Sequence, residues 1–232
     1  MNIQLIRFFE FLFFPYIFST SAHFTPLTLA LLEDSGWYKV DYSKATNAPF
    51  GLNSGCDFVT KDCIVNDSLP AYSKGNFCND LKSSLIDRCD PGHNFRGVCD
   101  LIDYSNTGYR PSREYFSKTS LGPDTMTHSD WCPTVFKYSD RGAECSDTSA
   151  EKNNNIEVFG DNSRCMDVSV SGSPSALCIS ASCDNEANAF IFEVGESSYS
   201  CGFGEDGKEL QINEKGSSYV FTCPKLVQAC PE

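Results

Sequence analysis

The chain has 232 residues, of which 41% are hydrophobic, so it is long enough for one globular domain with a real core, or one and a half. Its formal net charge of −13 argues against nucleic acid as a partner, because a polyanion is repelled by phosphate backbones. Thirteen cysteines lie between Cys56 and Cys230, a density typical of a disulfide framework made in an oxidising compartment. No Cys-x-x-Cys pair is present, so disulfides are favoured over structural zinc, and the odd count leaves at least one thiol without a partner in the chain.

Residues 1–22 have the pattern of a secretory signal peptide: Arg7, then the apolar run Phe8–Phe18, then small residues. Glu10 and Pro15 interrupt the run, which is also too short to span a bilayer. The alternative is a spurious leader from a wrongly chosen start codon. Because the cysteines independently favour an oxidising compartment, we expect a secreted or cell-surface protein.

A helix is predicted over residues 25–36. Thr25 can cap it, Pro26 suits its first position, and Gly36 suits its end. A helix with this many leucines is normally buried on at least two sides, yet little sequence between the leader and the helix is available to cover it. We therefore expect a sticky apolar surface made of Leu27, Leu31 and Trp37.

Short strands are predicted at residues 37–42, 153–159, 190–194 and 219–223 from alternating or β-prone composition. Residues 104–123 are rich in Tyr, Ser, Gly and Pro and should form a loop. Asp and Asn dominate the segments between the cysteines, and they favour turns. The only glycosylation sequon is Asn66-Asp67-Ser68, which makes Asn66 a candidate acceptor.

Residues 27–44, LTLALLEDSGWYKVDYSK, resemble a segment of the leishmanolysin family, the surface zinc metallopeptidases of kinetoplastids and their relatives in ciliates, trichomonads and animals. The order and rough spacing of the cysteines also resemble the C-terminal domain of that family. Shorter motifs that resemble the family follow in order at 53–58, 76–79, 131–133, 138–140, 158–165 and 222–224. The resemblance covers about residues 25–232.

Together with the strand pattern, the resemblance implies a mainly β fold with irregular loops, α+β overall. It divides the chain into the leader at 1–22, a remnant of the metzincin catalytic module at 23–45 (helix plus strand), and a cysteine-rich C-terminal domain at 46–232.

Members of the family bind zinc through a His-Glu-x-x-His helix, whose Glu is the general base, and a later third His above a Met-turn. This chain has His23, His93 and His128, none followed by Glu and no two four residues apart. We expect each to be a surface residue rather than a ligand. The sequence therefore predicts no catalytic, cofactor-binding or metal residue in this chain, with zinc belonging to the full-length family.

The resemblance also implies a disulfide pattern in which Cys56 is the orphan, because its counterpart in the family pairs with a cysteine of the catalytic region. Cys56 would then be open to that missing region or to another subunit. The remaining twelve cysteines would pair as Cys63–Cys132, Cys78–Cys99, Cys89–Cys165, Cys145–Cys178, Cys183–Cys230 and Cys201–Cys223.

Three functions remain open. The first is the C-terminal portion of a leishmanolysin-like zinc metalloendopeptidase, a membrane-associated family whose resemblance implies extracellular proteolysis and cell adhesion; this portion would be inactive by itself. The second is a secreted, non-catalytic, disulfide-rich module that binds an extracellular protein or a cell surface. The third is an unrelated disulfide-rich inhibitor or toxin-like scaffold, for which 232 residues is long.

Overall fold

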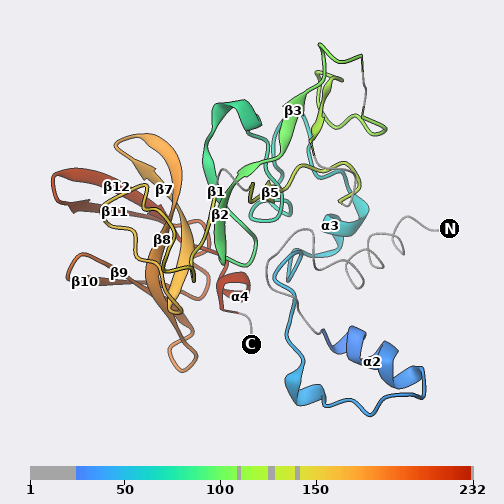
Figure 1. Ribbon diagram of the computed structural model, residues 1–232, viewed down its shortest axis with the longest axis horizontal. Coiled ribbons are helices and arrows are strands. Elements are labelled where there is room, and N and C mark those ends of the chain that lie inside the picture. The colour runs from blue at the N-terminus through green and yellow to red at the C-terminus, as the bar shows by residue number, and fades with distance from the viewer. Residues whose placement is uncertain (1–24, 109–110, 125–128, 139–141, 231–232) are drawn as a thin grey trace.

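The computed structural model describes residues 25–108, 111–124, 129–138 and 142–230. The expected leader at 1–22, His23 and His128 lie outside these residues. Figure 1 shows three regions in chain order: a lobe with helix α2 (residues 25–45), a central region of loops and short strands (46–144), and a C-terminal region of longer strands (163–230). The expected mainly β fold with irregular loops is confirmed.

The predicted N-terminal helix is confirmed as α2, Pro26–Asp34, capped by the Thr25 hydroxyl, which accepts a hydrogen bond from the backbone N–H of Thr28 at 3.2 Å. The strand predicted at 37–42 is wrong. Its first part is irregular, and its last residue begins the 3₁₀-helix η1, Tyr42–Lys44. The Asp41 carboxylate accepts from the backbone N–H of Ser43 at 3.0 Å, so a local cap overrides the weak strand preference.

The central region is built on small antiparallel sheets. Strand β2 pairs with β1, β5 and β6, and β3 pairs separately with β4. Because β4 lies inside the segment 104–123 that was predicted to be a loop, that prediction is wrong at its C-terminal end. The elements are α3 Cys56–Thr60, η2 Lys82–Ser84, β1 Asp87–Cys89, β2 Phe95–Cys99, β3 Leu101–Asp103, β4 Leu121–Pro123, β5 Val135–Phe136 and β6 Ala143–Glu144.

The C-terminal region is an antiparallel sheet in the order β10-β9-β8-β7-β12-β11. Its long strand β8 pairs with β7 over 173–180 and with β9 over 181–184. The strands predicted at 190–194 and 219–223 are confirmed as β9 and β12. The elements are β7 Ser163–Val170, β8 Ser173–Asp184, β9 Ala189–Val194, β10 Ser197–Gly202, β11 Glu209–Glu214, β12 Ser217–Thr222 and the short helix α4 Leu226–Ala229.

The strand predicted at 153–159 is wrong. The segment forms turns instead, because the side chain of Glu157 is buried and bonded inside the protein. Glu157 is fully buried, and its carboxylate lies 3.0 Å from Nε of the buried Arg96 on β2. It also accepts from the backbone N–H groups of Asn153 and Cys178, at 2.5 and 3.1 Å. A buried charge needs such partners, and the backbone bends into turns to supply them.

Two hydrophobic cores lie in the central region and in the C-terminal sheet, and a smaller cluster of disulfides joins them. Cys165 on β7 and Cys178 on β8 are register partners. One is bonded to Cys89 on β1 and the other to Cys145 just after β6. The small sheet is therefore fastened to the large one by two adjacent covalent links.

Candidate functional site

The structure contains six disulfides, and they join the same pairs that the resemblance implied. Their closed loops run from 21 residues for Cys78–Cys99 to 76 residues for Cys89–Cys165. Cys56 is free and exposed. The one free thiol of the chain therefore lies at the surface, at the start of α3.

His93, expected at the surface, is buried, so that expectation is wrong. Its backbone is left-handed, with φ of 56°, and its Nδ1 lies 2.7 Å from the carbonyl oxygen of Cys165, to which it donates. The Asp90 carboxylate holds the turn by accepting from the backbone N–H groups of Gly92, Asn94 and Phe95. The ring therefore ties the turn between β1 and β2 to β7.

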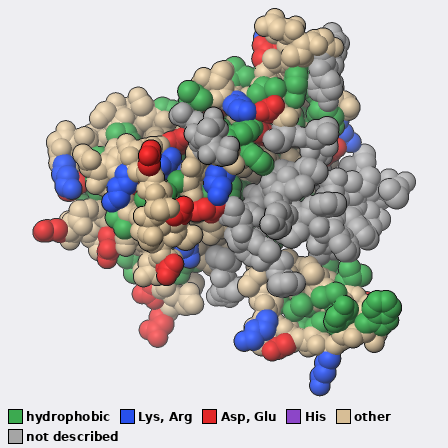
Figure 2. Space-filling model, viewed as in Figure 1, with side chains coloured by type: hydrophobic (Ala, Val, Ile, Leu, Met, Phe, Trp, Pro, Cys, Tyr) green, Lys and Arg blue, Asp and Glu red, His purple; other side chains and the backbone are tan. Residues whose placement is uncertain are grey.

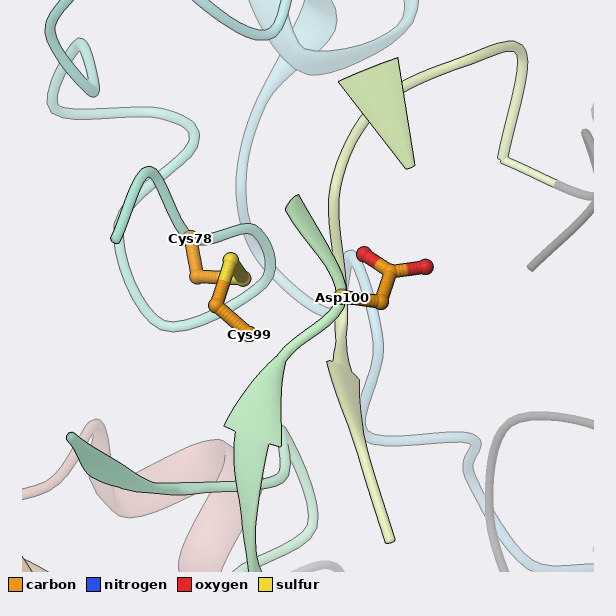
Figure 3. A group of neighbouring side chains, drawn as sticks. All are labelled: Cys78, Cys99 and Asp100. Atoms are coloured by element: carbon orange, nitrogen blue, oxygen red, sulfur yellow. A yellow bond between two sulfur atoms is a disulfide. The ribbon is translucent and has the colours of Figure 1, made fainter. Parts of the chain in front are cut away.

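The family resemblance implies zinc, so a zinc site would need a cluster of ligand side chains among the described residues. One group of possible ligands lies close together, Cys78, Cys99 and Asp100 (Figure 3). The two sulfur atoms are joined as a disulfide and offer no thiolate, while Asp100 points away and accepts from the backbone N–H of Thr134 at 2.8 Å. These residues do not fit a zinc ion, which needs thiolate, imidazole or carboxylate ligands arranged tetrahedrally.

Cys56 is the first residue of helix α3, and this helix packs on the central region through Phe58. Phe58, two residues further on, packs against Phe50 and Phe77 with ring centroids 5.5 Å apart in both cases. Gly51 lies beneath this cluster with φ of +74°, and a Cβ there would be 2.7 Å from the Phe58 ring. Because Phe58 is anchored, the exposed thiol of Cys56 is held at a defined position on the surface.

A buried amide pair fastens the loop before α3 to the C-terminal helix. Asn76 Oδ1 accepts from the backbone N–H of Gly51 at 2.7 Å and from Gln228 Nε2 at 2.8 Å. Gln228 Nε2 also donates to the carbonyl of Pro49, and Asn76 Nδ2 donates to Ser54 Oγ. Gln228 on α4 and residues 49–54 thus share one hydrogen-bond network. No local sequence pattern predicts it, because Asn76 and Gln228 lie 152 residues apart.

The lobe carries exposed apolar side chains, as the sequence predicted for three of them. We call this set the apolar lobe surface: Leu27 (40% exposed), Leu31 (42%), Trp37 (86%), Tyr38 (57%) and Tyr42 (45%). Figure 2 shows hydrophobic side chains gathered over the α2 segment. The Tyr42 hydroxyl donates to the Glu33 carboxylate at 2.8 Å, which folds η1 back on the helix and raises the pKa of the tyrosine.

One cavity of about 240 Å³ opens between the central region and β7. Arg88 in its wall makes a two-point contact with Asp80, at 2.7 and 3.1 Å. Burial raises the pKa of Asp167, which accepts from the backbone N–H of Cys89. Arg88 and Asp80 are therefore paired with each other, and Asp167 links β7 to β1. None of these three residues is a nucleophile with an adjacent base.

Comparison with known proteins settles the family. The leishmanolysin family model matches residues 16–232. The chain belongs to the leishmanolysin family. It is 29% identical to leishmanolysin of Leishmania major over an alignment of 229 positions, which covers 91% of this chain and 36% of that protein. It is 28% identical to leishmanolysin of Leishmania donovani, covering 37% of it, and 29% identical over 168 residues to a leishmanolysin-like peptidase of Caenorhabditis briggsae.

The chain thus spans about a third of the length of the curated leishmanolysins that it matches. Family membership makes it a metallopeptidase-related domain rich in disulfides. The helices of the described ranges are all too short or too polar to cross a membrane.

Proposed function

We propose that this chain is the C-terminal, non-catalytic part of a leishmanolysin-type zinc metalloendopeptidase that acts outside the cell, with roles in extracellular proteolysis and adhesion. The observation that carries the proposal is the family match across residues 16–232 in a chain that covers only 36% of the Leishmania major relative. Six disulfides support a secreted or cell-surface location, because such bonds persist in oxidising compartments.

We infer that zinc and its general base belong to another part of the peptidase. Hydrolysis by zinc needs three protein ligands and a base near the metal-bound water. The three histidines of this chain, His23, His93 and His128, include no two at the four-residue spacing of a His-Glu-x-x-His helix. His93 is committed to Cys165, and the nearest cysteines to Asp100 are already oxidised to a disulfide.

We further infer that Cys56 and the apolar lobe surface both meet the rest of the peptidase. An exposed cluster of Trp, Tyr and Leu side chains is costly in water and favours a protein contact. The Cys56 thiol is exposed and held in place by Phe58, as a covalent tether to a partner segment requires.

The test has two parts. The purified chain is assayed for bound zinc and for cleavage of a mixed peptide library, with leishmanolysin of Leishmania major as the positive control. We expect no stoichiometric zinc and no cleavage. In parallel, the native transcript is read through the start site. An in-frame His-Glu-x-x-His, a third His and one extra cysteine upstream support the proposal, and zinc-dependent cleavage by the chain alone contradicts it.

The exposed thiol of Cys56 also favours a second candidate, a secreted binding or adhesion module joined to another subunit. Non-reducing electrophoresis of the wild-type chain and of Cys56→Ser distinguishes the two. A dimer that disappears on reduction and in the variant supports the module. A monomer with one reactive thiol supports the first proposal, in which the partner cysteine lies in the peptidase itself.

A further inference from the structure

We propose that Asn66 carries an N-linked oligosaccharide. The sequon Asn66-Asp67-Ser68 occurs once in the chain, and the structure places it on a tight surface turn. Asn66 and Asp67 have φ of 52° and 59°, and Val65 and Ser68 exchange backbone hydrogen bonds at 3.0 and 3.1 Å. This is a type I′ turn, whose two central residues project away from the residues that pair beneath them.

The acceptor side chain is open to solvent. Asn66 is exposed, and within the described ranges no residue forms a hydrogen bond with its side-chain amide. A sugar on Nδ2 would therefore displace no contact of the folded protein. The two other sequon residues are exposed as well, so the turn leaves room for a bulky, hydrated group.

The neighbouring residue holds the turn in place. The Asp67 carboxylate accepts from the backbone N–H of Ser117 at 2.7 Å, and the Asp67 carbonyl accepts from Asn79 Nδ2 at 3.1 Å. Its hydrogen bonds from Ser117 keep the pKa of Asp67 below its usual range, so the carboxylate stays charged near neutral pH. The turn is thus anchored through Asp67 while Asn66 stays accessible, and the two central residues have separate tasks.

The modification is a group transfer from a lipid-linked oligosaccharide pyrophosphate. Nδ2 of Asn66 forms a bond to the anomeric carbon of the sugar, the bond from that carbon to the pyrophosphate oxygen breaks, the lipid pyrophosphate leaves with the electron pair of that bond, and the amide releases one proton to solvent. The inference rests on the proposed secreted or cell-surface location, because the lipid-linked oligosaccharide and its transferase lie in the secretory pathway.

The experiment uses the full chain behind a heterologous signal peptide in eukaryotic cells, so that entry into the secretory pathway does not depend on the leader of the chain. Four proteins are compared: wild type, Asn66→Asp, Ser68→Ala and Ser68→Thr. Asp tolerates left-handed backbone and so removes the acceptor while preserving the turn, and Thr preserves the sequon. Each is treated with peptide N-glycosidase and examined by electrophoresis, and the free thiols are counted.

We expect one glycosidase-sensitive mobility shift in the wild type and in Ser68→Thr, lost completely in Asn66→Asp and Ser68→Ala. The proposal is overturned if a wild-type chain with a single free thiol, and hence with its disulfides formed, shows no shift. A shift that persists in Ser68→Ala also overturns it. Because zinc and peptidase activity are not read out here, failure of the proposed function would be detected separately.

Discussion

The N-terminal lobe and the rest of the chain differ in where their large apolar side chains lie: those of the lobe are mostly exposed, and those of the C-terminal sheet are buried. In the C-terminal sheet, Phe190, Phe192 and Phe221 are wholly buried. In the lobe, Leu31 and Trp37 are exposed, and the leucine of α2 that is buried is Leu29. No disulfide reaches the lobe, whereas all six lie between Cys63 and Cys230. The rest of the chain is held by six disulfides and two hydrophobic cores, while the exposed leucine and tryptophan of the lobe are typical of an interface.

The largest effect is expected at the buried ion pair between Arg96 and Glu157, which lies outside the lobe. Glu157→Ala leaves Arg96 charged and without its closest partner, which should lower the free energy of unfolding by about 3–5 kcal/mol. The measurement is guanidinium unfolding with the disulfides intact. Lys61→Ala, which breaks the exposed pair with Asp57, is the matched control and should leave the unfolding midpoint nearly unchanged. Equal effects of the two variants would contradict this account.

Removing disulfides should sharpen the same contrast. The double variant Cys89→Ser with Cys165→Ser opens a loop of 76 residues, and Cys201→Ser with Cys223→Ser opens one of 22. Each should cost about 2–4 kcal/mol, with the longer loop costing about 1 kcal/mol more because it restricts the unfolded chain more strongly. Unfolding in urea measures both, and a larger loss from the shorter loop would argue against the entropic explanation.

The amide network that carries the loop before α3 is expected to matter less. Gln228→Ala removes the side-chain donor to the buried Pro49 carbonyl and one of the two donors to Asn76 Oδ1, which keeps its bond from Gly51, at a cost of about 1–3 kcal/mol. The variant should also be cut faster by protease within residues 49–60. The exposed Gln211 on β11 is the control, and Gln211→Ala should change neither measurement.

Polar substitutions in the lobe should hardly change stability. Trp37→Ser is expected to shift the free energy of unfolding by no more than about 0.5 kcal/mol, because Trp37 is 86% exposed, and Leu31→Ser by about 1 kcal/mol, because Leu31 is 42% exposed. Self-association measured by sedimentation should fall in both. Phe203→Ser, at an exposed aromatic outside the lobe, is the control and should leave association unchanged. A large loss of stability in Trp37→Ser would show that the lobe is closed by contacts of its own.

The smallest effect concerns acid. Lys118 and Ser120 hold the pKa of the Asp103 carboxyl well below its usual range. Since the folded pKa is the lower one, this contribution to stability is present above the ordinary Asp pKa of about 4 and is lost as the pH falls toward the folded value. Asp103→Asn should therefore destabilise slightly at neutral pH and make no difference at low pH. A difference that grows on acidification would reverse this sign.

Local chemistry explains what could be predicted about the fold. Helix α2 begins where Thr25 and Pro26 predict, and β9 and β12 lie where β-prone residues alternate. The same local reasoning was wrong where distant partners decide the outcome. Residues 153–159 read as a strand, but their backbone follows the buried charge of Glu157, and Asp41 caps η1 where a strand was expected.

The candidate site divides in the same way. The sequence by itself determined the disulfide-rich character, the one sequon, the absence of a His-Glu-x-x-His motif and the exposed leucines of the lobe, because these depend on residue type and short spacing. Only the tertiary structure decided that His93 is buried against Cys165, that Gln228 reaches Asn76, and that the turn bearing Asn66 is anchored through Asp67. Those contacts join residues 50 to 152 positions apart, and no local pattern encodes which distant backbone group will lie within hydrogen-bond reach once the chain has folded.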